Sequence, residues 1–263
     1  MATRKPNILF IGYGHLAKSL LSNDFKKYNN IYAINSKNNF FSIKLKKIIK
    51  KQNIQYDYIF LLVRPDIFLK KGKDFRKHIS SNSTVVSCIA GIKLSTISRI
   101  LDKRKVIRIM PNIMAKQNKS QTFIFSKDKK ILDRSFDKLI KFFGSNHYIT
   151  DEDQINLATS VFGSGPAFIA LLINSYIQAA KSLSKKSKLK DIDLINLYKN
   201  VLSINLNSKD LENFLNSICS KKGTTQAGIE FLKSQNIKKI IYTTLDKAYK
   251  RARDISIEKQ SSK

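Results

Sequence analysis

A glycine-containing segment near the start of the chain has the residues and spacing of a phosphate-binding turn. Gly12, Gly14 and Ala17 form a G-x-G-x-x-A pattern directly after the apolar run Asn7–Ile11 and at the opening of a helical pattern. The first glycine permits a tight turn, the second lets a pyrophosphate approach the backbone, and the small alanine lets helix and strand pack closely. Unpaired N–H groups and the positive helix end then face the diphosphate. The segment therefore predicts a dinucleotide site, to which His15 and Leu16 also contribute.

The end of the second expected strand, Ile31–Ile34, predicts which dinucleotide binds. An acidic residue there would hold a ribose 2′-hydroxyl, but the chain reads Asn35, Ser36 and Lys37. A hydroxyl and an ammonium can bind a 2′-phosphate, and no carboxylate repels it. We therefore expect NADP(H), with NAD(H) as the alternative. The competing interpretation is that Lys37 is one more surface lysine of a basic chain.

A second glycine-containing segment, "CSKKGTTQAGIEFL" from Cys219 to Leu232, precedes an amphipathic run. Gly223 frees the backbone, so that residues 223 to 225 can aim unpaired N–H groups at an anion. The alternative is a solvent loop in which Thr225 caps the following helix. The residues alone favour this capping role.

The elements that must position these segments fall into two groups, and the first 150 residues alternate short apolar runs with helical patterns. This alternation predicts a doubly wound, mostly parallel sheet with helices on both faces, an α/β Rossmann-like domain. The expected strands are Asn7–Ile11, Ile31–Ile34, Tyr58–Val63, Thr84–Ile89, Val106–Met110 and Gln121–Phe125, and the expected helices cover residues 14–27, 40–51 and 130–143.

From Asp151 onward the strand signal disappears and apolar residues recur at helical spacing. We therefore expect a domain of residues 1–150 followed by an all-α domain of residues 151–263. The apolar stripes of the second part are too broad for a lone small bundle, so we expect a partner subunit to share them.

The formal charge of +30 is the most extreme property of the composition. Such a charge draws anions, including phosphorylated coenzymes, and is also typical of nucleic-acid binding. However, the densest lysine clusters, Lys44–Gln52 and Lys181–Lys190, have no interleaved aromatic residues, and lysines occur on nearly every expected helix. The charge is therefore interpreted as solvated helix faces, and no nucleic-acid partner is expected.

Membrane, disulfide and metal sites are not expected. The longest apolar run, Ala167–Ile173, has seven residues where a membrane span needs about twenty. The first residues lack the apolar core of a signal peptide, which favours a soluble cytoplasmic protein. Cys88 and Cys219 lie far apart, and the three histidines have no ligand spacing.

Four further segments occur in a characteristic order, "FLLVRPD", "SCIAGI", "RIMPNIMA" and "GSGPAF", and "SKKGTTQAG" of the second glycine segment closes the series. Together they resemble pyrroline-5-carboxylate reductase, the enzyme of the last step of proline synthesis, across nearly the whole chain. The resemblance implies a Rossmann domain for NAD(P)H and a helical domain that forms a homodimer with its twofold mate, or a larger ring of such dimers. The substrate would be a cyclic imino acid, and no metal would be needed because the coenzyme carries the reducing equivalents.

The resemblance also assigns roles to particular residues. It places Val63, Arg64 and Pro65 in the coenzyme lining, and Ala90, Gly91 and the Met110–Asn112 segment beside the nicotinamide. Residues 163–166 would open the dimerisation helix, where small residues permit close backbone contact. For the second glycine segment it implies that Ser220, Gly223, Thr224 and Thr225 bind the substrate carboxylate. Thr225 would hydrogen-bond the ring nitrogen as the catalytic residue, which reverses the preference for a capping role.

The chain departs from the family pattern at several positions. Lys221 and Lys222 replace a Pro-Gly pair, and Lys222 is strained if the family loop needs a positive φ there. Ile113 and Met114 replace Thr-Pro, Phe162 replaces a small residue, and His15 replaces Asn or Gln. A divergent or non-catalytic NAD(P)-binding relative therefore stays open as the alternative, and a basic nucleic-acid-binding protein as a more distant one.

Overall fold

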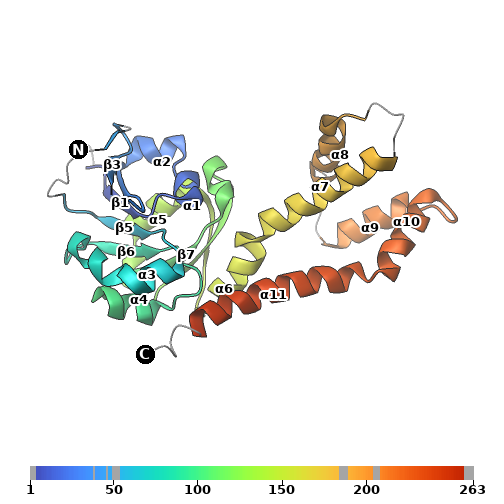
Figure 1. Cartoon of the computed structure of the whole chain (residues 1–263). Helices are drawn as coiled ribbons and strands as arrows, with labels where there is room; N and C mark the ends of the chain where they lie inside the picture. The colour runs from blue at the N-terminus through green and yellow to red at the C-terminus, as the bar shows by residue number, and fades with distance from the viewer. Residues whose placement is uncertain are drawn as a thin grey trace. The chain divides into compact units, whose positions relative to one another are not determined.

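The structure, a computed structural model, describes residues 4–37, 39–45, 47–48, 54–183, 189–203 and 208–257. The chain divides into two compact units, Met1–Gly163 together with Ala248–Lys263, and Ser164–Lys247. The first unit contains the sheet, and the elements described in the second unit are all helices (Figure 1). The expected Rossmann-like sheet followed by an all-α part is confirmed. The domain boundary at residue 150 stays a prediction.

The sheet of the first unit has nine strands in the order β4-β3-β2-β1-β5-β6-β7-β8-β9. Neighbours from β2 to β7 are parallel, as are β8 and β9, whereas β3 pairs antiparallel with β2 and β4, and β8 with β7. The strands are β1 Asn7–Ile11, β2 Asn30–Ile34, β3 Phe40–Ser42, β4 Lys47–Ile48, β5 Tyr58–Leu61, β6 Thr84–Ser87, β7 Val106–Met110, β8 Ser120–Phe125 and β9 Gly144–Tyr148.

Helices cover both faces of this sheet because its central strands are apolar on both sides. Strand β1 shows the alternation: Ile8 and Phe10 belong to one buried cluster, Leu9 and Ile11 to the other. The first cluster includes α1 His15–Ser19, α2 Asn23–Tyr28 and α5 Arg134–Ile140. The second includes α3 Pro65–Lys71, α4 Leu94–Leu101 and α6 Gln154–Ala158. This unit also contains short 3-10 helices and one π-helical segment. The 3-10 helices are η1 Gly72–His78, η2 Ile113–Gln117, η3 Lys129–Ile131 and η4 Lys141–Phe143, and the π-helical segment is η5 Thr159–Gly163.

The helix expected over residues 40–51 is wrong for the part that the structure describes. Residues 40–42 and 47–48 form β3 and β4, which extend the sheet edge, β3 antiparallel to β2 and β4 antiparallel to β3. Residues 46 and 49–51 lie outside the described residues. Cross-strand packing decides the conformation, because the rings of Phe40 and Tyr32 stack 5.7 Å apart.

The helix expected over residues 14–27 is interrupted and forms two short helices, α1 and α2. Ser22 ends the first pattern because its hydroxyl accepts a hydrogen bond from the Phe25 amide at 3.2 Å, which caps α2. Strand β9 was not expected from the sequence. Its polar residues lie at the sheet edge beside β8, and its first residue, Gly144, has a φ of 134°.

The second unit contains α7 Gly165–Leu183, α8 Asp191–Ser203, α9 Ser208–Ile218, α10 Thr224–Ser234 and the first part of α11 Ile237–Ile257. Large apolar side chains of this unit are exposed in the single chain, among them Leu171 (63%), Phe231 (64%) and Tyr242 (70%). Apolar surface of this extent needs a covering partner.

The helical stretch Gln154–Leu183 is long and apolar enough to span a membrane by length and composition. The sequence did not predict this, because its longest uninterrupted apolar run has only seven residues. One such helix is weak evidence for a membrane span, because helices of soluble proteins pass the same test.

Candidate coenzyme and substrate site

One cavity of the first unit brings together three of the segments expected to bind the coenzyme. It has a volume of about 380 Å³ and lies where β1, β2 and β5 end. The carboxyl ends of parallel strands are the usual place of a ligand in open α/β sheets. Its lining includes six of the predicted residues: Gly12, Gly14, Asn35, Ser36, Val63 and Arg64.

The β1–α1 turn has the backbone geometry that the glycine pattern predicts. Gly12 has a φ of 101°, its amide donates to the Ile34 carbonyl at 2.9 Å, and a Cβ there would lie 2.7 Å from the Leu62 oxygen. Gly14 is the N-cap of α1 with a φ of −89°, and a Cβ there would meet no atom within 4 Å. The two glycines therefore serve different purposes: the first makes the turn possible, and the second leaves open space above the backbone.

The helix end beside this open space offers unpaired donors. In the described part of the chain, the amides of Gly14, His15 and Leu16 make no hydrogen bond. His15 is exposed and Leu16 is half-buried, while Ala17 is 1% exposed and packs into the core. Backbone N–H groups aimed at an open cavity at a helix start can receive a diphosphate.

The loop after β2 presents Ser36 and Lys37 because the Asn35 side chain folds the backbone around itself. Its Oδ1 accepts hydrogen bonds from the amides of Lys37 at 3.0 Å and Asn39 at 2.9 Å. Ser36 lines the coenzyme cavity and also a neighbouring cavity of about 270 Å³, which Lys37 lines. A hydroxyl and an ammonium thus lie at the place expected for a 2′-phosphate.

Residues from α3 and η1 that the sequence did not point to complete both cavities. Lys71 and Phe75 line the two, and Lys77 lines the smaller one together with the carboxylate of Asp74. Arg64 precedes Pro65, the first residue of α3, and its Nη2 lies 3.3 Å from Asp66 Oδ2. No sequence signal marks Lys71, because one more lysine on a helix of this basic chain carries no information.

The two loops expected beside the nicotinamide are held by contacts within the first unit. Gly91 has a φ of 69°, and a Cβ there would lie 2.5 Å from Ile255 Cγ2. Asn112 is the N-cap of η2: its Oδ1 accepts from the Met114 amide at 2.9 Å, and its Nδ2 donates to the Phe162 carbonyl at 3.0 Å. Ala90 is half-buried. The contact of these loops with a coenzyme stays a prediction.

The second glycine segment lies in the other unit, where it forms a tight turn before α10. The Gly223 amide donates to the Ser220 carbonyl at 3.0 Å, and a Cβ on Gly223 would lie 2.3 Å from Ser220 Oγ. The expectation of an unpaired amide is therefore wrong for Gly223. In the described residues the amides of Thr224 and Thr225 make no hydrogen bond, so two of the three expected donors are free.

Lys222 has the strained conformation that its replacement of a family glycine implies. Its φ is 61°, in the left-handed region that favours glycine. Its amide donates to Gln226 Oε1 at 2.7 Å, and Gln226 Nε2 donates to Glu230 at 2.7 Å. Gln226 holds the turn, a role that the sequence did not reveal.

The capping role considered for Thr225 is wrong. Helix α10 begins at Thr224, its N-cap is Gly223, and no side chain caps it. Thr225 is the second residue of the helix and half-buried, whereas Thr224 is exposed. The hydroxyl of Thr225 is therefore not needed to begin the helix.

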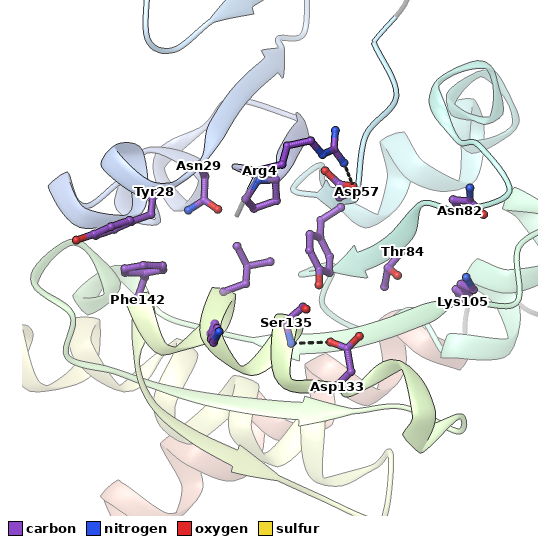
Figure 2. A pocket seen from close by; sticks show the side chains of 14 residues that line it. Arg4, Tyr28, Asn29, Asp57, Asn82, Thr84, Lys105, Asp133, Ser135 and Phe142 are labelled. Atoms are coloured by element: carbon purple, nitrogen blue, oxygen red, sulfur yellow. Dashed lines mark hydrogen bonds and ion pairs between the residues drawn. The ribbon is translucent and has the colours of Figure 1, made fainter. Parts of the chain in front are cut away.

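A larger cavity lies elsewhere in the first unit, with a volume of about 540 Å³ (Figure 2). It includes the first residues of β5 and β6, at the amino ends of these strands, and contains none of the predicted site residues. Its charged groups are partly paired within the cavity: Arg4 bonds Asp57 at 2.6 Å, and Asp133 caps α5 by accepting from the Ser135 amide at 2.9 Å.

Comparison with known proteins places this geometry in a family. Residues 152–255 match the family model for pyrroline-5-carboxylate reductase dimerisation. Pyrroline-5-carboxylate reductase of Staphylococcus aureus (strain COL) is 30% identical over 95% of this chain and 97% of the relative.

Two solved structures share the fold along nearly the whole chain. The pyrroline carboxylate reductase of Plasmodium falciparum with NADP bound has a TM-score of 0.78 and 17% identity, covering 95% of this chain and 98% of that one. The 1-pyrroline-5-carboxylate reductase of Streptococcus pyogenes has a TM-score of 0.78 and 23% identity with the same coverage. The resemblance drawn from the sequence motifs is confirmed, and the chain belongs to the pyrroline-5-carboxylate reductase family.

Proposed function

We propose that the chain reduces the imine bond of 1-pyrroline-5-carboxylate to give L-proline, with NADPH as the reductant, as a soluble cytoplasmic homodimer. Membership of the family along the whole chain is the observation that carries this proposal. The exposed apolar helices of the second unit lie in the region that matches the dimerisation model, which supports the dimer. The alternative assembly is a larger ring of such dimers.

The residues present fit the coenzyme. The β1–α1 turn offers free amides and open space at Gly14 for the diphosphate. The loop after β2 offers the Ser36 hydroxyl and the Lys37 ammonium for the 2′-phosphate. The lining of the coenzyme cavity contains no carboxylate. The neighbouring cavity that Lys37 lines contains one, Asp74, together with the two further lysines Lys71 and Lys77. When bound, the coenzyme supplies the reducing equivalents from its nicotinamide ring. Val63, Arg64 and Pro65 complete its lining, and the loops at Ala90–Gly91 and Met110–Asn112 hold the nicotinamide end.

The substrate would bind at the start of α10. Its carboxylate accepts hydrogen bonds from the free amides of Thr224 and Thr225. The positive end of this eleven-residue helix further stabilises the negative charge. The Thr225 hydroxyl hydrogen-bonds the ring nitrogen, orients the imine and helps to deliver the proton that this nitrogen gains as hydride reaches the adjacent carbon, while Ser220 and Gly223 shape the turn. No acid–base pair is required of the chain, because its contribution to the rate is orientation of the two reactants.

The competing proposal is a divergent NAD(P)-binding relative that acts on another substrate or has lost activity. The observation that favours it is the pair Lys221–Lys222, which places a left-handed lysine beside the substrate amides. The lysine charge favours a carboxylate, whereas the strain of its backbone opposes the tight turn.

A turnover assay on the wild type and two variants tests the proposal. Purified protein is mixed with 1-pyrroline-5-carboxylate and NADPH, and the absorbance of the reduced nicotinamide is followed. We expect turnover by the wild type and a large loss of kcat in Thr225→Ala. Thr243→Ala, a change at another half-buried threonine of a helix in the same unit, serves as the control and keeps wild-type turnover. Coenzyme binding without turnover would favour the divergent relative.

A further inference from the structure

One carboxylate oxygen joins the segments that adjoin the two expected nicotinamide loops. Glu152 Oε1 accepts a hydrogen bond from the Leu94 amide at 2.6 Å and another from Arg108 Nη1 at 2.6 Å. Leu94 is the first residue of α4 and follows Gly91 by three positions. Arg108 lies on β7, two residues before Met110. A single side chain therefore fixes the spacing between the exit of the first loop and the entrance of the second.

Burial of Arg108 makes this contact necessary. The Arg108 side chain is 2% exposed, and its Nε and Nη2 have no hydrogen-bond partner in the described part of the chain. Burial lowers the pKa of this guanidinium, and the charge of Glu152 acts in the opposite direction. A buried guanidinium without its carboxylate would be left as an uncompensated charge, so the side chain of Glu152 is held firmly in its place.

The adjacent residue, Asp153, binds the C-terminal half of α11 to this unit. Its Oδ2 accepts from the Tyr249 hydroxyl at 2.5 Å, and its Oδ1 lies 3.9 Å from Arg253 Nε. The hydrogen bond from Tyr249 lowers the pKa of Asp153, which keeps this carboxylate ionised. These residues of α11 belong to the same compact unit as the sheet.

The fastened end of α11 packs directly on Gly91. Ala252 is 3% exposed, and a Cβ on Gly91 would lie 2.5 Å from Ile255 Cγ2 and 2.9 Å from the Ala252 carbonyl oxygen. The left-handed backbone of Gly91 is thus enclosed by α11 on the side where a side chain would project. Loss of the hydrogen bond between Tyr249 and Asp153 would weaken the packing of α11 on Gly91.

We propose that Glu152 and Asp153 are positioning residues that hold the Ala90–Gly91 and Met110–Asn112 loops in the arrangement that orients the nicotinamide. Glu152 acts through Leu94 and Arg108, and Asp153 acts through the end of α11. This inference rests on the proposed function, since it assigns the nicotinamide end of the coenzyme to these two loops. The adenine end is bound by the β1–α1 turn and by Ser36, which neither acidic residue contacts.

Loss of either contact should therefore impair orientation more than binding of the adenine half. An error of about 1 Å in the position of a reacting group lowers the rate by up to about a hundredfold. We expect Glu152→Gln to lower kcat by on the order of tenfold or more. We expect Tyr249→Phe, which removes one hydroxyl from α11, to cause a smaller loss in the same direction.

The experiment compares two ligands in the full-length protein. NADPH reports on both ends of the site, whereas 2′,5′-ADP contains only the adenine end with its 2′-phosphate. Dissociation constants for both, and kcat and KM for turnover, are measured for the wild type, Glu152→Gln and Tyr249→Phe. Glu212→Gln, a change at an exposed residue of α9, is the charge-matched control. Circular dichroism checks that each variant is folded. If Glu152→Gln does not fold, the measurements on Tyr249→Phe decide the inference.

The expected result is weaker NADPH binding and lower kcat with unchanged affinity for 2′,5′-ADP. Equal weakening of both ligands would overturn the inference, because the acidic residues would then stabilise the whole unit without orienting one end. Wild-type kcat in Tyr249→Phe together with a folded, fully active Glu152→Gln would overturn it as well. An inactive wild type would refute the proposed function instead, and the ratio of the two dissociation constants would still decide the inference.

Discussion

The two glycines of the first turn allow backbone strain to be separated from coenzyme contact. In Gly14→Ala the new methyl group meets no protein atom within 4 Å, and the backbone at φ −89° suits any residue. Two small effects on stability oppose each other. Alanine restricts the unfolded chain, which stabilises by about 0.4–1 kcal/mol, but it is a poorer N-cap than glycine by a similar amount. We therefore expect a change in the free energy of unfolding within about 0.5 kcal/mol.

Binding of NADPH should respond differently, because the free amides and open space at Gly14 are where the diphosphate is expected. A methyl group forced into a filled site costs roughly 1–3 kcal/mol. At 1.4 kcal/mol for each factor of ten, the dissociation constant should rise between about fivefold and 150-fold.

Gly12→Ala is the matched comparison within the same turn. Its φ of 101° is unfavourable for alanine, and its Cβ would lie 2.7 Å from the Leu62 oxygen. Left-handed strain of roughly 1–2 kcal/mol and overpacking of roughly 1–3 kcal/mol together predict a loss of about 2–5 kcal/mol in stability.

Urea unfolding followed by circular dichroism measures stability, and quenching or enhancement of nicotinamide fluorescence measures NADPH binding. The expected pattern is an unstable Gly12→Ala beside a stable Gly14→Ala that binds NADPH weakly. A Gly14→Ala protein with wild-type affinity would refute the placement of the diphosphate at this turn.

Three further predictions follow from strain, burial and exposure. Lys222→Gly removes a left-handed lysine at φ 61° and should raise the free energy of unfolding by up to about 1 kcal/mol in urea titrations, and a loss of stability would contradict the strain. Burial raises the pKa of the Cys88 thiol. The unfolded chain therefore releases this proton first, so stability should fall as pH rises through the unfolded thiol pKa, and Cys88→Ala should flatten that fall in unfolding titrations. Leu171→Lys, at a side chain that is 63% exposed in the single chain, should lower the dimer fraction in sedimentation experiments, whereas Lys26→Glu, at an exposed residue of α2 in the first unit, should not.

The parts of the fold that could be predicted from the sequence are those set by local pattern. A short continuous apolar run such as Ile8–Ile11, followed directly by the glycines at 12 and 14, is typical of a central strand that ends in a tight turn. The coenzyme cavity then follows from topology, because parallel strands place their carboxyl ends at one edge of the sheet.

The errors occur where long-range pairing decides the structure. Residues 40–42 have a pattern short enough for either helix or strand, and pairing with β2 settles it. Residues 14–27 contain a capping signal, Ser22 followed by an acidic residue in the first turn, which divides the helical pattern. The edge strand β9 is polar on its exposed side and offers no alternation from which to infer it.

The contacts made by Glu152 and Asp153 could not be found from sequence, because they join residues 44 and 96 positions apart. One signal was available: Arg108 is the single charged residue of the strand "VIRIM", and a charge in a strand buried on both faces needs a partner. That partner is Glu152, and its neighbour Asp153 is bound by Tyr249 of α11. In this unit the electrostatic requirement of one buried side chain thus connects the sheet to the last helix, and both connections adjoin the loops on which the proposed chemistry depends.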